Sequence, residues 1–476
     1  MKKFIVVISF LSVLFFSCPE EGIDPIDAPD VIKQSFYVHN FKTSGVDSVE
    51  TGLLADGKYC HIWVGRGANI TKESAISIAN TYDNNIYIKM MKYFSLHKED
   101  EIVLEGKKLN NTLDIASLMV NYDGKLNIIL VDITDNYDKG NNNAYTAGYF
   151  WNGDLFKRDT KNHPYSNECA AIFIDTYPAV PGSEESNSTL AHEMQHLMSY
   201  LNGFLSRDKD FDIWIDEGLS LSAEYLYLEK HISSRVSHYN NDPSKLICKG
   251  NNFFVWGNRK EESNYASLDD YATDYLFFQW LRMQTSNDIY YYIMFSSENN
   301  YQAVFEAYND RASNKVNSWD TLLKTWLAAN QINAATGPYG YKGQLNITTH
   351  TAPVPQTSIS LYPGEGVYSK MPSSTLSPSG NIKYAYLSSS DVSESYTTNS
   401  TTLLTYNKNT NLSGSIETGT TTGIAASEQI VPDARFIASL RNEPIRIDAR
   451  DMMGRDEWRN SYSNGVPGLG RGLNDE

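Results

Sequence analysis

The segment "HEMQH" carries residue types and a spacing that suit chemistry at a metal ion. His192 and His196 are four positions apart, so on a helix both imidazoles lie on one face. Two imidazoles one helical turn apart can reach the same tetrahedral zinc ion. Glu193, beside the first histidine, can reach a metal-bound water without binding the metal. Without a third ligand, the motif also fits an ordinary amphipathic helix.

A third ligand is available in the segment "WIDEG", which follows the motif in the chain. Glu217 comes after a stretch that accommodates a helix end, a turn and the return of an antiparallel helix. That return brings its carboxylate towards His192 and His196, and Gly218 lets the two helices approach closely. A surface acid on an amphipathic helix is the alternative. We predict one zinc ion, bound by His192, His196 and Glu217, with Glu193 as general base.

The two motifs together resemble those of the gluzincin class of zinc metallopeptidases, which bind zinc through two histidines and one glutamate. The zinc aminopeptidases have a similar "WLNEGFA" segment. The flanking segments "AGYFWNGDLF", "YSNECAAIFIDTYP", "DDYATDYLFFQWL" and "LLKTWLAANQI" are more similar to the hyicolysin-type metallopeptidases. The resemblance covers roughly residues 120 to 335. It implies a zincin-like α+β fold and hydrolysis of peptide bonds.

The resemblance also implies a tyrosine, near the start of a later helix, that stabilises the oxyanion. "YATDYLFFQWL" corresponds to that helix and indicates Tyr271 as the second catalytic residue. Ser267 and Asp270 are spaced as in a capping box, which would place Tyr271 in the first turn, where the helix dipole favours negative charge. Other candidates for this role are Tyr265, Tyr275, His231 and His238.

Three further acids are candidates for supporting roles. Glu224 is seven residues after Glu217, hence on the same helical face, and can orient a zinc-bound histidine. Asp216 is less well placed for this. Glu168 precedes His192 at the distance at which zinc aminopeptidases hold the substrate amine, but the glycine and methionine of their "GxMEN" motif are absent. We therefore expect Glu168 in the substrate wall.

The pattern of apolar and turn residues divides the chain into an α+β peptidase domain and a small all-β module. After an acidic linker at 18–35, strand-like runs and one helical segment predict a sheet-containing part at 36–180. Helical periodicity dominates 181–335, which carries the zinc site. Short β-prone runs with turn residues predict a separate β-rich module at 336–460, followed by a flexible tail at 461–476.

The first residues are similar to a bacterial lipoprotein signal. Lys2 and Lys3 precede a short apolar run and Ser17, so residues 1–17 form the predicted signal peptide and Cys18 the lipidated terminus. Phe15 departs from the usual leucine, and a plain secretory signal is the alternative. We expect export and lipid anchoring at the cell envelope, at the outer membrane or cell surface rather than facing the periplasm from the inner membrane.

Composition narrows the function further. The formal net charge of −17 and the lack of a basic stripe exclude binding to nucleic acid backbones. The cysteines other than Cys18 are three and widely spaced, which argues against a disulfide framework. The sequence therefore predicts a zinc metalloendopeptidase acting on extracellular or envelope polypeptides. A zinc aminopeptidase and a non-enzymatic surface binding lipoprotein are the alternatives, and the oligomeric state stays open.

Overall fold

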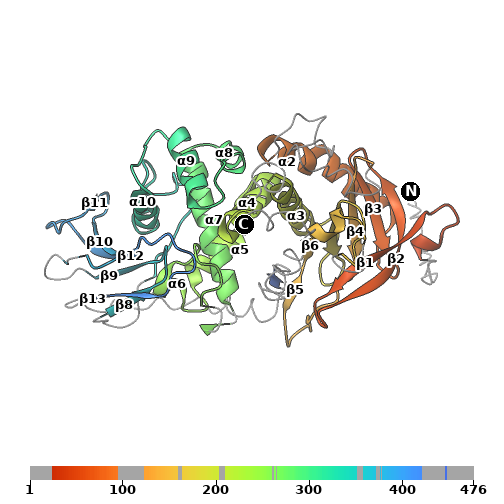
Figure 1. The fold of residues 1–476 in the computed structure, drawn as a ribbon, viewed down its shortest axis with the longest axis horizontal. Coiled ribbons are helices and arrows are strands. Elements are labelled where there is room, and N and C mark those ends of the chain that lie inside the picture. The colour runs from red at the N-terminus through yellow and green to blue at the C-terminus, as the bar shows by residue number, and fades with distance from the viewer. Residues whose placement is uncertain are drawn as a thin grey trace, which may run out of the picture.

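The computed structural model describes residues 24–94, 123–158, 163–202, 210–259, 262–263, 265–350, 358–370, 376, 378–420 and 445–447. The predicted signal peptide, Cys18 and the predicted tail lie outside these residues. The described part is mixed α+β, as expected from the sequence. Figure 1 shows a curved sheet at one end, helices in the middle and a smaller group of strands at the other end.

The N-terminal part is built on a six-stranded sheet of order β1-β2-β3-β4-β7-β6. β1 to β3 are antiparallel, β3, β4 and β7 run parallel, and β6 is an antiparallel edge strand. The strands are β1 (Lys33–Asn40), β2 (Gly45–Asp56), β3 (Cys60–Gly65), β4 (Leu126–Val131), β6 (Gly148–Phe150) and β7 (Ala171–Asp175). Strand β2 was not expected, because its first half is largely exposed and lacks a clean apolar alternation.

Alternate residues of the central strands supply two separate cores. Ile128 and Ile172 face a large core that helices share, whereas Ile129 and Phe173 face a smaller core on the other side of the sheet. Helices α1 (Lys72–Thr81) and α2 (Tyr87–Phe94) cover the first face and are joined by a π-helical turn, η2 (Tyr82–Ile86). Thr71 caps α1 by accepting a hydrogen bond from the Ser74 amide.

The middle of the chain is helical, as predicted. Its helices are α3 (Glu184–Asn202), α4 (Ile213–Leu228), α5 (Ser233–Asn241), α6 (Ile247–Gly250), α7 (Ala266–Gln284), α8 (Ile289–Met294), α9 (Tyr301–Arg311) and α10 (Trp319–Ile332). α7 is buried almost throughout and packs against α4 and α5. A Cβ on Gly218 would meet the ring of Phe278 at 2.1 Å. Gly218 therefore permits the close approach of α4 to α7, which corrects our expectation that it serves the contact with the histidine helix.

The strands after residue 350 form a small antiparallel sheet of order β11-β10-β12-β9 and a two-stranded ribbon of β13 and β8. They are β8 (Ser358–Leu361), β9 (Gly366–Lys370), β10 (Ile382–Leu387), β11 (Val392–Ser393), β12 (Thr402–Asn407) and β13 (Glu417–Thr420). They pack on α10, where the Tyr368 hydroxyl donates to the Leu327 carbonyl at 2.7 Å. A buried ion pair of Arg259 with Glu365 ties the sheet to the loop before α7.

One short strand lies away from that module. β14 (Ile445–Ile447) pairs in parallel with β5 (Ala144–Thr146), next to the edge of the large sheet. Its residues fall inside the range predicted for the C-terminal module, whose boundaries stay a prediction. Two short 3-10 helices, η1 (Pro25–Asp27) and η4 (Asn152–Leu155), complete the elements needed here.

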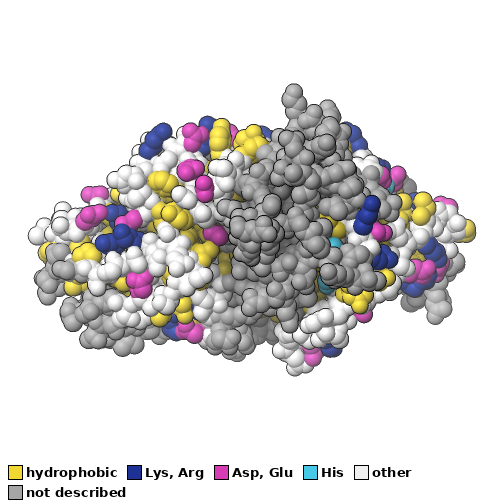
Figure 2. All heavy atoms as spheres, viewed as in Figure 1, with side chains coloured by type: hydrophobic (Ala, Val, Ile, Leu, Met, Phe, Trp, Pro, Cys, Tyr) yellow, Lys and Arg dark blue, Asp and Glu magenta, His cyan; other side chains and the backbone are white. Residues whose placement is uncertain are grey.

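No helix among the described residues is long and apolar enough to cross a membrane. On the face in Figure 2, acidic and basic side chains of the described residues are interspersed, without a broad basic surface.

Candidate metal centre

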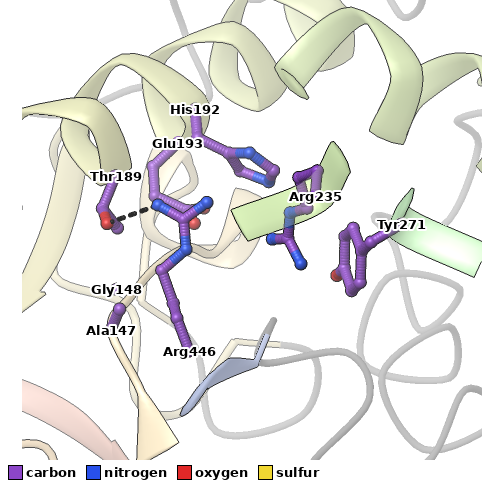
Figure 3. A pocket seen from close by; sticks show the side chains of 8 residues that line it. All are labelled: Ala147, Gly148, Thr189, His192, Glu193, Arg235, Tyr271 and Arg446. Carbon is purple, nitrogen blue, oxygen red and sulfur yellow. Dashed lines mark hydrogen bonds between the residues drawn. The ribbon is translucent and has the colours of Figure 1, made fainter. Parts of the chain in front are cut away.

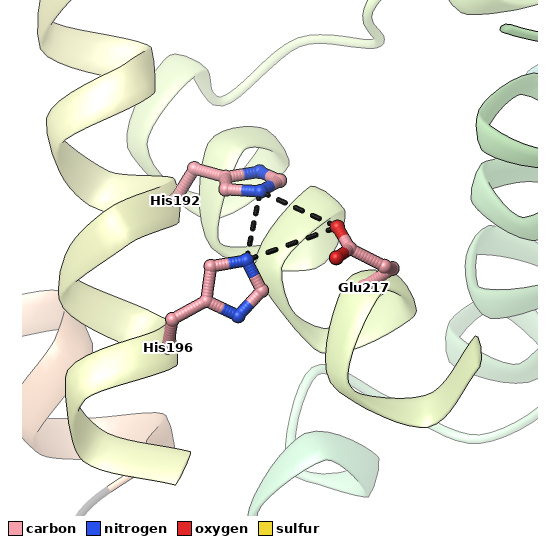
Figure 4. A group of neighbouring side chains, drawn as sticks. All are labelled: His192, His196 and Glu217. Carbon is pink, nitrogen blue, oxygen red and sulfur yellow. Dashed lines mark hydrogen bonds and ion pairs between the residues drawn. The ribbon is translucent and has the colours of Figure 1, made fainter. Parts of the chain in front are cut away.

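Helices α3 and α4 bring the three predicted zinc ligands together. The two histidines project from one face of α3, and Glu217 reaches them from the first half of α4 (Figure 4). The Nε2 atoms of His192 and His196 are 3.1 Å apart. Oε2 of Glu217 lies 3.5 Å from the first and 3.8 Å from the second. All three side chains are buried.

These distances suit a small cation between the three atoms. Ligands about 2.0–2.1 Å from a tetrahedral zinc ion are themselves roughly 3.3 Å apart. The observed separations of 3.1 to 3.8 Å bracket that value. Two imidazole nitrogens and one carboxylate oxygen also form a donor set typical of zinc. The cluster is therefore compatible with a zinc site.

Each histidine is oriented by a carboxylate on α4. Nδ1 of His192 lies 2.9 Å from Oε1 of Glu224, and Nδ1 of His196 lies 3.0 Å from Oδ2 of Asp216. A carboxylate beside Nδ1 favours the proton there, which leaves the Nε2 lone pair facing the cluster. Glu224 thus lies where we expected. Asp216, which we expected to be less well placed, also contacts a histidine, because it precedes Glu217 in the part of α4 that faces His196.

Glu193 faces a pocket beside the cluster. Its Oε2 accepts a hydrogen bond of 3.1 Å from the backbone amide of Phe150, which is on the edge strand β6. The strand comes this close because Gly148 has no side chain. A Cβ there would lie 2.9 Å from Thr189 of α3. The sheet edge and the motif helix therefore share one wall of the pocket.

The pocket is lined by residues from five elements or the loops beside them (Figure 3). They are Ala147, Gly148, Thr189, His192, Glu193, Arg235, Tyr271 and Arg446. The two arginines were not among the predicted site residues. Arg235 is on α5 and Arg446 on β14, far from the motif in sequence, so no local spacing could have indicated them.

Arg446 connects β14 to the histidine helix. It forms an ion pair with Glu224, and its Nη1 donates to the Thr189 hydroxyl at 2.9 Å. Ser188 also donates to Glu224, at 2.9 Å. Burial raises the pKa of Glu224, but Arg446 and His192 outweigh it and hold that pKa well below its usual range. Glu224 is therefore an ionised, fully engaged partner of His192.

Tyr271 lies on the pocket wall opposite Glu193, but not at a helix start. α7 begins at Ala266, and its N-cap, Tyr265, makes no side-chain capping bond. The expected capping box is wrong, because Asp270 instead accepts a hydrogen bond of 2.6 Å from the Gly257 amide. Tyr271 is thus in the second turn, against Trp256 and Arg235.

The alternatives to Tyr271 are outside the set of pocket-lining residues. The hydroxyl of Tyr275 lies 3.0 Å from Nδ1 of His231, and Nε2 of His238 lies 2.7 Å from Oδ1 of Asp269. Burial lowers the pKa of His231 to about 4 and that of His238 to about 3. Tyr265 is the cap of α7. None of these four lines the pocket.

Two other acids complete the description. Glu168 accepts a hydrogen bond of 2.9 Å from the Arg158 amide and is not among the pocket-lining residues, and its place in the substrate wall stays a prediction. Asp274 of α7 is fully buried without a hydrogen bond to any described residue. Burial, followed by the charge of Glu217, raises its pKa well above the usual range. A neutral Asp274 adds no negative charge beside Glu217.

The cysteines play no part in the cluster. Cys60, Cys169 and Cys248 are free and buried, and none belongs to the candidate metal site among the described residues.

Comparison with known proteins gives one informative relative. The chain is 30% identical over 321 residues to the neutral metalloprotease ShpI of Staphylococcus hyicus. The match covers 65% of this chain and 65% of that protein, so the chain spans slightly less than two thirds of the relative's length. No family model matches the sequence. The chain is thus similar to a metalloprotease, and its His192–His196–Glu217 cluster is compatible with a metal site.

Proposed function

We propose that this protein is a zinc-dependent metalloendopeptidase that cuts extracellular or envelope polypeptides. The observation that carries the proposal is the convergence of three zinc-type donor atoms beside a pocket that His192 and Glu193 both line. The similarity to a neutral metalloprotease supports it. A zincin-like arrangement, in which a sheet edge runs beside the motif helix, fits the position of β6 next to α3.

His192, His196 and Glu217 would hold the ion. Zinc bound there would act as a Lewis acid, making water a stronger nucleophile at neutral pH and polarising the scissile carbonyl. Residues of the chain would orient the ligands, transfer the proton and stabilise the oxyanion. The carboxylates of Glu224 and Asp216 keep both imidazoles in the binding tautomer.

Glu193 is the proposed general base. Its carboxylate lines the pocket and is held by the Phe150 amide. It would take the proton of the attacking water and pass a proton to the leaving nitrogen. The Tyr271 hydroxyl, on the facing wall, would donate a hydrogen bond to the oxyanion.

The substrate would lie along the sheet edge. β6 pairs with β7 on one side, and its other side faces the pocket region near α3. An extended polypeptide can add to such an edge through backbone hydrogen bonds. Glu168 accepts a hydrogen bond from a backbone amide and is outside the set of pocket-lining residues, which favours an endopeptidase over the aminopeptidase alternative.

Lipid anchoring through Cys18 and location at the outer membrane or cell surface remain part of the proposal. They rest on the N-terminal sequence pattern alone. Membrane fractionation of the native protein, compared with a Cys18→Ala variant, tests them.

The test of the enzymatic proposal is hydrolysis of casein by wild type and Glu193→Gln. Loss of a general base should lower the rate by roughly 10²- to 10⁴-fold. Zinc content should be unchanged, because Glu193 is not a ligand. Glu184→Gln, on the exposed first turn of the same helix, is the matched control.

Peptides with blocked and free N-termini separate the endopeptidase from the aminopeptidase. Undiminished hydrolysis by Glu193→Gln would overturn the mechanism, and absence of both zinc and activity in wild type would favour the binding-protein alternative.

A further inference from the structure

One cation in the pocket is not used by the proposed chemistry. Arg235 extends from α5 between His192 and Tyr271, and its guanidinium lies 4.7 Å from the centre of the Tyr271 ring (Figure 3). Its residue exposure is only 9%. An arginine is charged at any physiological pH, so this is a buried positive charge.

Within the part of the chain that the structure describes, this charge has no partner. No ion pair or hydrogen bond joins the Arg235 guanidinium to another described residue, and its Nε is buried without an acceptor. A buried charge is costly unless it is paired and hydrogen-bonded. Stacking on one tyrosine offsets only a small part of that cost.

The acidic side chains near Arg235 interact with other residues. Glu224 is held by Arg446, His192 and Ser188. Glu217 faces the two histidines, and its attraction for Arg235 acts from beyond ion-pair distance. The second arginine of the pocket differs in this respect, because Arg446 has both an ion pair and a hydroxyl partner. Arg235 is thus the cation that an incoming anion can reach.

We propose that Arg235 is a specificity residue that binds a carboxylate of the polypeptide substrate next to the scissile bond. The inference rests on the proposed peptidase function. A guanidinium matches a carboxylate with two parallel hydrogen bonds, and the polypeptide offers this group in an acidic side chain or at its C-terminus. Binding would supply the missing partner and fix the substrate against the Tyr271 wall.

This role explains why an uncompensated charge persists in the pocket. Sites built to bind a charged ligand carry a stability cost that the ligand removes. Substrates without the carboxylate leave Arg235 buried and unpaired, so they are bound less well. Arg235 therefore discriminates in two ways: it binds substrates that carry the carboxylate, and it weakens the binding of substrates that lack it.

The experiment uses zinc-loaded full-length protein and a set of peptides with one neutral reference sequence and blocked ends. In one arm, glutamate replaces glutamine at each position flanking the cut. In the other arm, the C-terminal amide becomes a free carboxylate. Wild type should prefer one carboxylate peptide over its neutral partner by roughly 30-fold in kcat/KM. The arm that shows the preference identifies the source of the carboxylate.

Substitutions then assign the preference to Arg235. Arg235→Gln should abolish it by lowering kcat/KM for the carboxylate peptide to the value for its neutral partner, and Arg235→Lys should retain part of it. Arg282→Gln is the matched control, because Arg282 also stacks on a tyrosine but is hydrogen-bonded to Gln279 and Gln344. The melting temperature of Arg235→Gln should equal or exceed that of wild type.

Three outcomes would count against the inference. A wild type that cuts all the peptides equally would overturn it and leave the proposed function intact. An Arg235→Gln variant that is folded but slowed equally on every peptide would also overturn it, since the arginine would then serve the reaction in general. A wild type that binds zinc but cuts no peptide would overturn the proposed function, and this inference with it.

Discussion

The two walls of the pocket are built in different ways. The metal wall comes from α3 and α4, two consecutive helices, and its residues follow one another within 26 positions from His192 to Glu217. The facing wall joins Arg235 of α5, Tyr271 of α7 and Arg446 of β14, which are separated by up to 211 positions. The first wall depends on helical periodicity, whereas the second depends on the whole fold.

The two walls also differ in how their charges are satisfied. Both histidines have a carboxylate at Nδ1, and Glu224 has three partners. On the facing wall, Arg446 is paired with Glu224, whereas Arg235 has an aromatic ring and no anion among the described residues. In the proposed function, the metal wall would hold the ion and the facing wall would contact the substrate. Four experiments test the difference.

Removal of a ligand should have the largest effect. Glu217→Ala should lower zinc affinity by more than the roughly 100-fold that orienting carboxylates contribute, because the two remaining donors cannot enclose the ion. Metal content after dialysis, together with casein hydrolysis, measures this. Glu184→Ala, at the start of α3, should keep both. Full zinc occupancy in Glu217→Ala would remove this residue from the site.

Chelation should loosen one wall and spare the other. Without the ion, three buried donor atoms face one another across α3 and α4, so these helices should lose protection from hydrogen exchange. A site saturated 1,000-fold above its Kd contributes about 4 kcal/mol to stability, and the melting temperature should fall accordingly. Helices α5 and α7 should keep their protection. Equal loss along all four helices would show that the walls are not independent.

The two orienting carboxylates should differ in importance. Glu224→Gln should weaken zinc binding by roughly 100-fold, the upper end of the range for such partners. Asp216→Asn should cost less, because its side chain is 19% exposed while that of Glu224 is 2% exposed. Zinc titration against a competing chelator compares them. A larger loss for Asp216→Asn would reverse this ranking.

The smallest effect is expected for Arg446, which touches the metal wall only through Glu224 and Thr189. Arg446→Gln should weaken zinc binding by about tenfold or less, since Glu224 keeps His192 and Ser188. The same zinc titration measures it. Arg66, directly after β3, is an exposed arginine paired with Asp27 and Glu50, and Arg66→Gln should change nothing. An effect as large as that of Glu217→Ala would make β14 part of the metal wall.

The metal wall could be predicted from the sequence more easily than the facing wall. Spacing along two helices was enough to bring His192, His196 and Glu217 together, and to place Glu224 on the same helical face. Most strands were visible as apolar runs, because the central strands are buried on both faces. β2 was missed because its exposed half gives no periodic signal.

Local sequence spacing could not predict how the facing wall is assembled. The helix carrying Tyr271 was identified, but its start was misplaced, because Asp270 binds a loop amide instead of capping the helix. Asp216 was undervalued because the rotation of α4 about its axis depends on tertiary packing against α7. Arg446 could not be anticipated, since nothing near it in sequence indicates that β14 returns to the pocket.

X-ray absorption at the zinc edge of the purified wild-type protein tests whether His192, His196 and Glu217 hold zinc. We predict one zinc per chain, with two imidazole nitrogens at roughly 2.0–2.1 Å and a carboxylate oxygen at roughly 2.0–2.2 Å. Loss of one imidazole from the spectrum in His196→Ala should accompany loss of affinity. Sulfur ligation at roughly 2.3 Å, or less than stoichiometric zinc in fully metallated buffer, would contradict the site described for His192, His196 and Glu217.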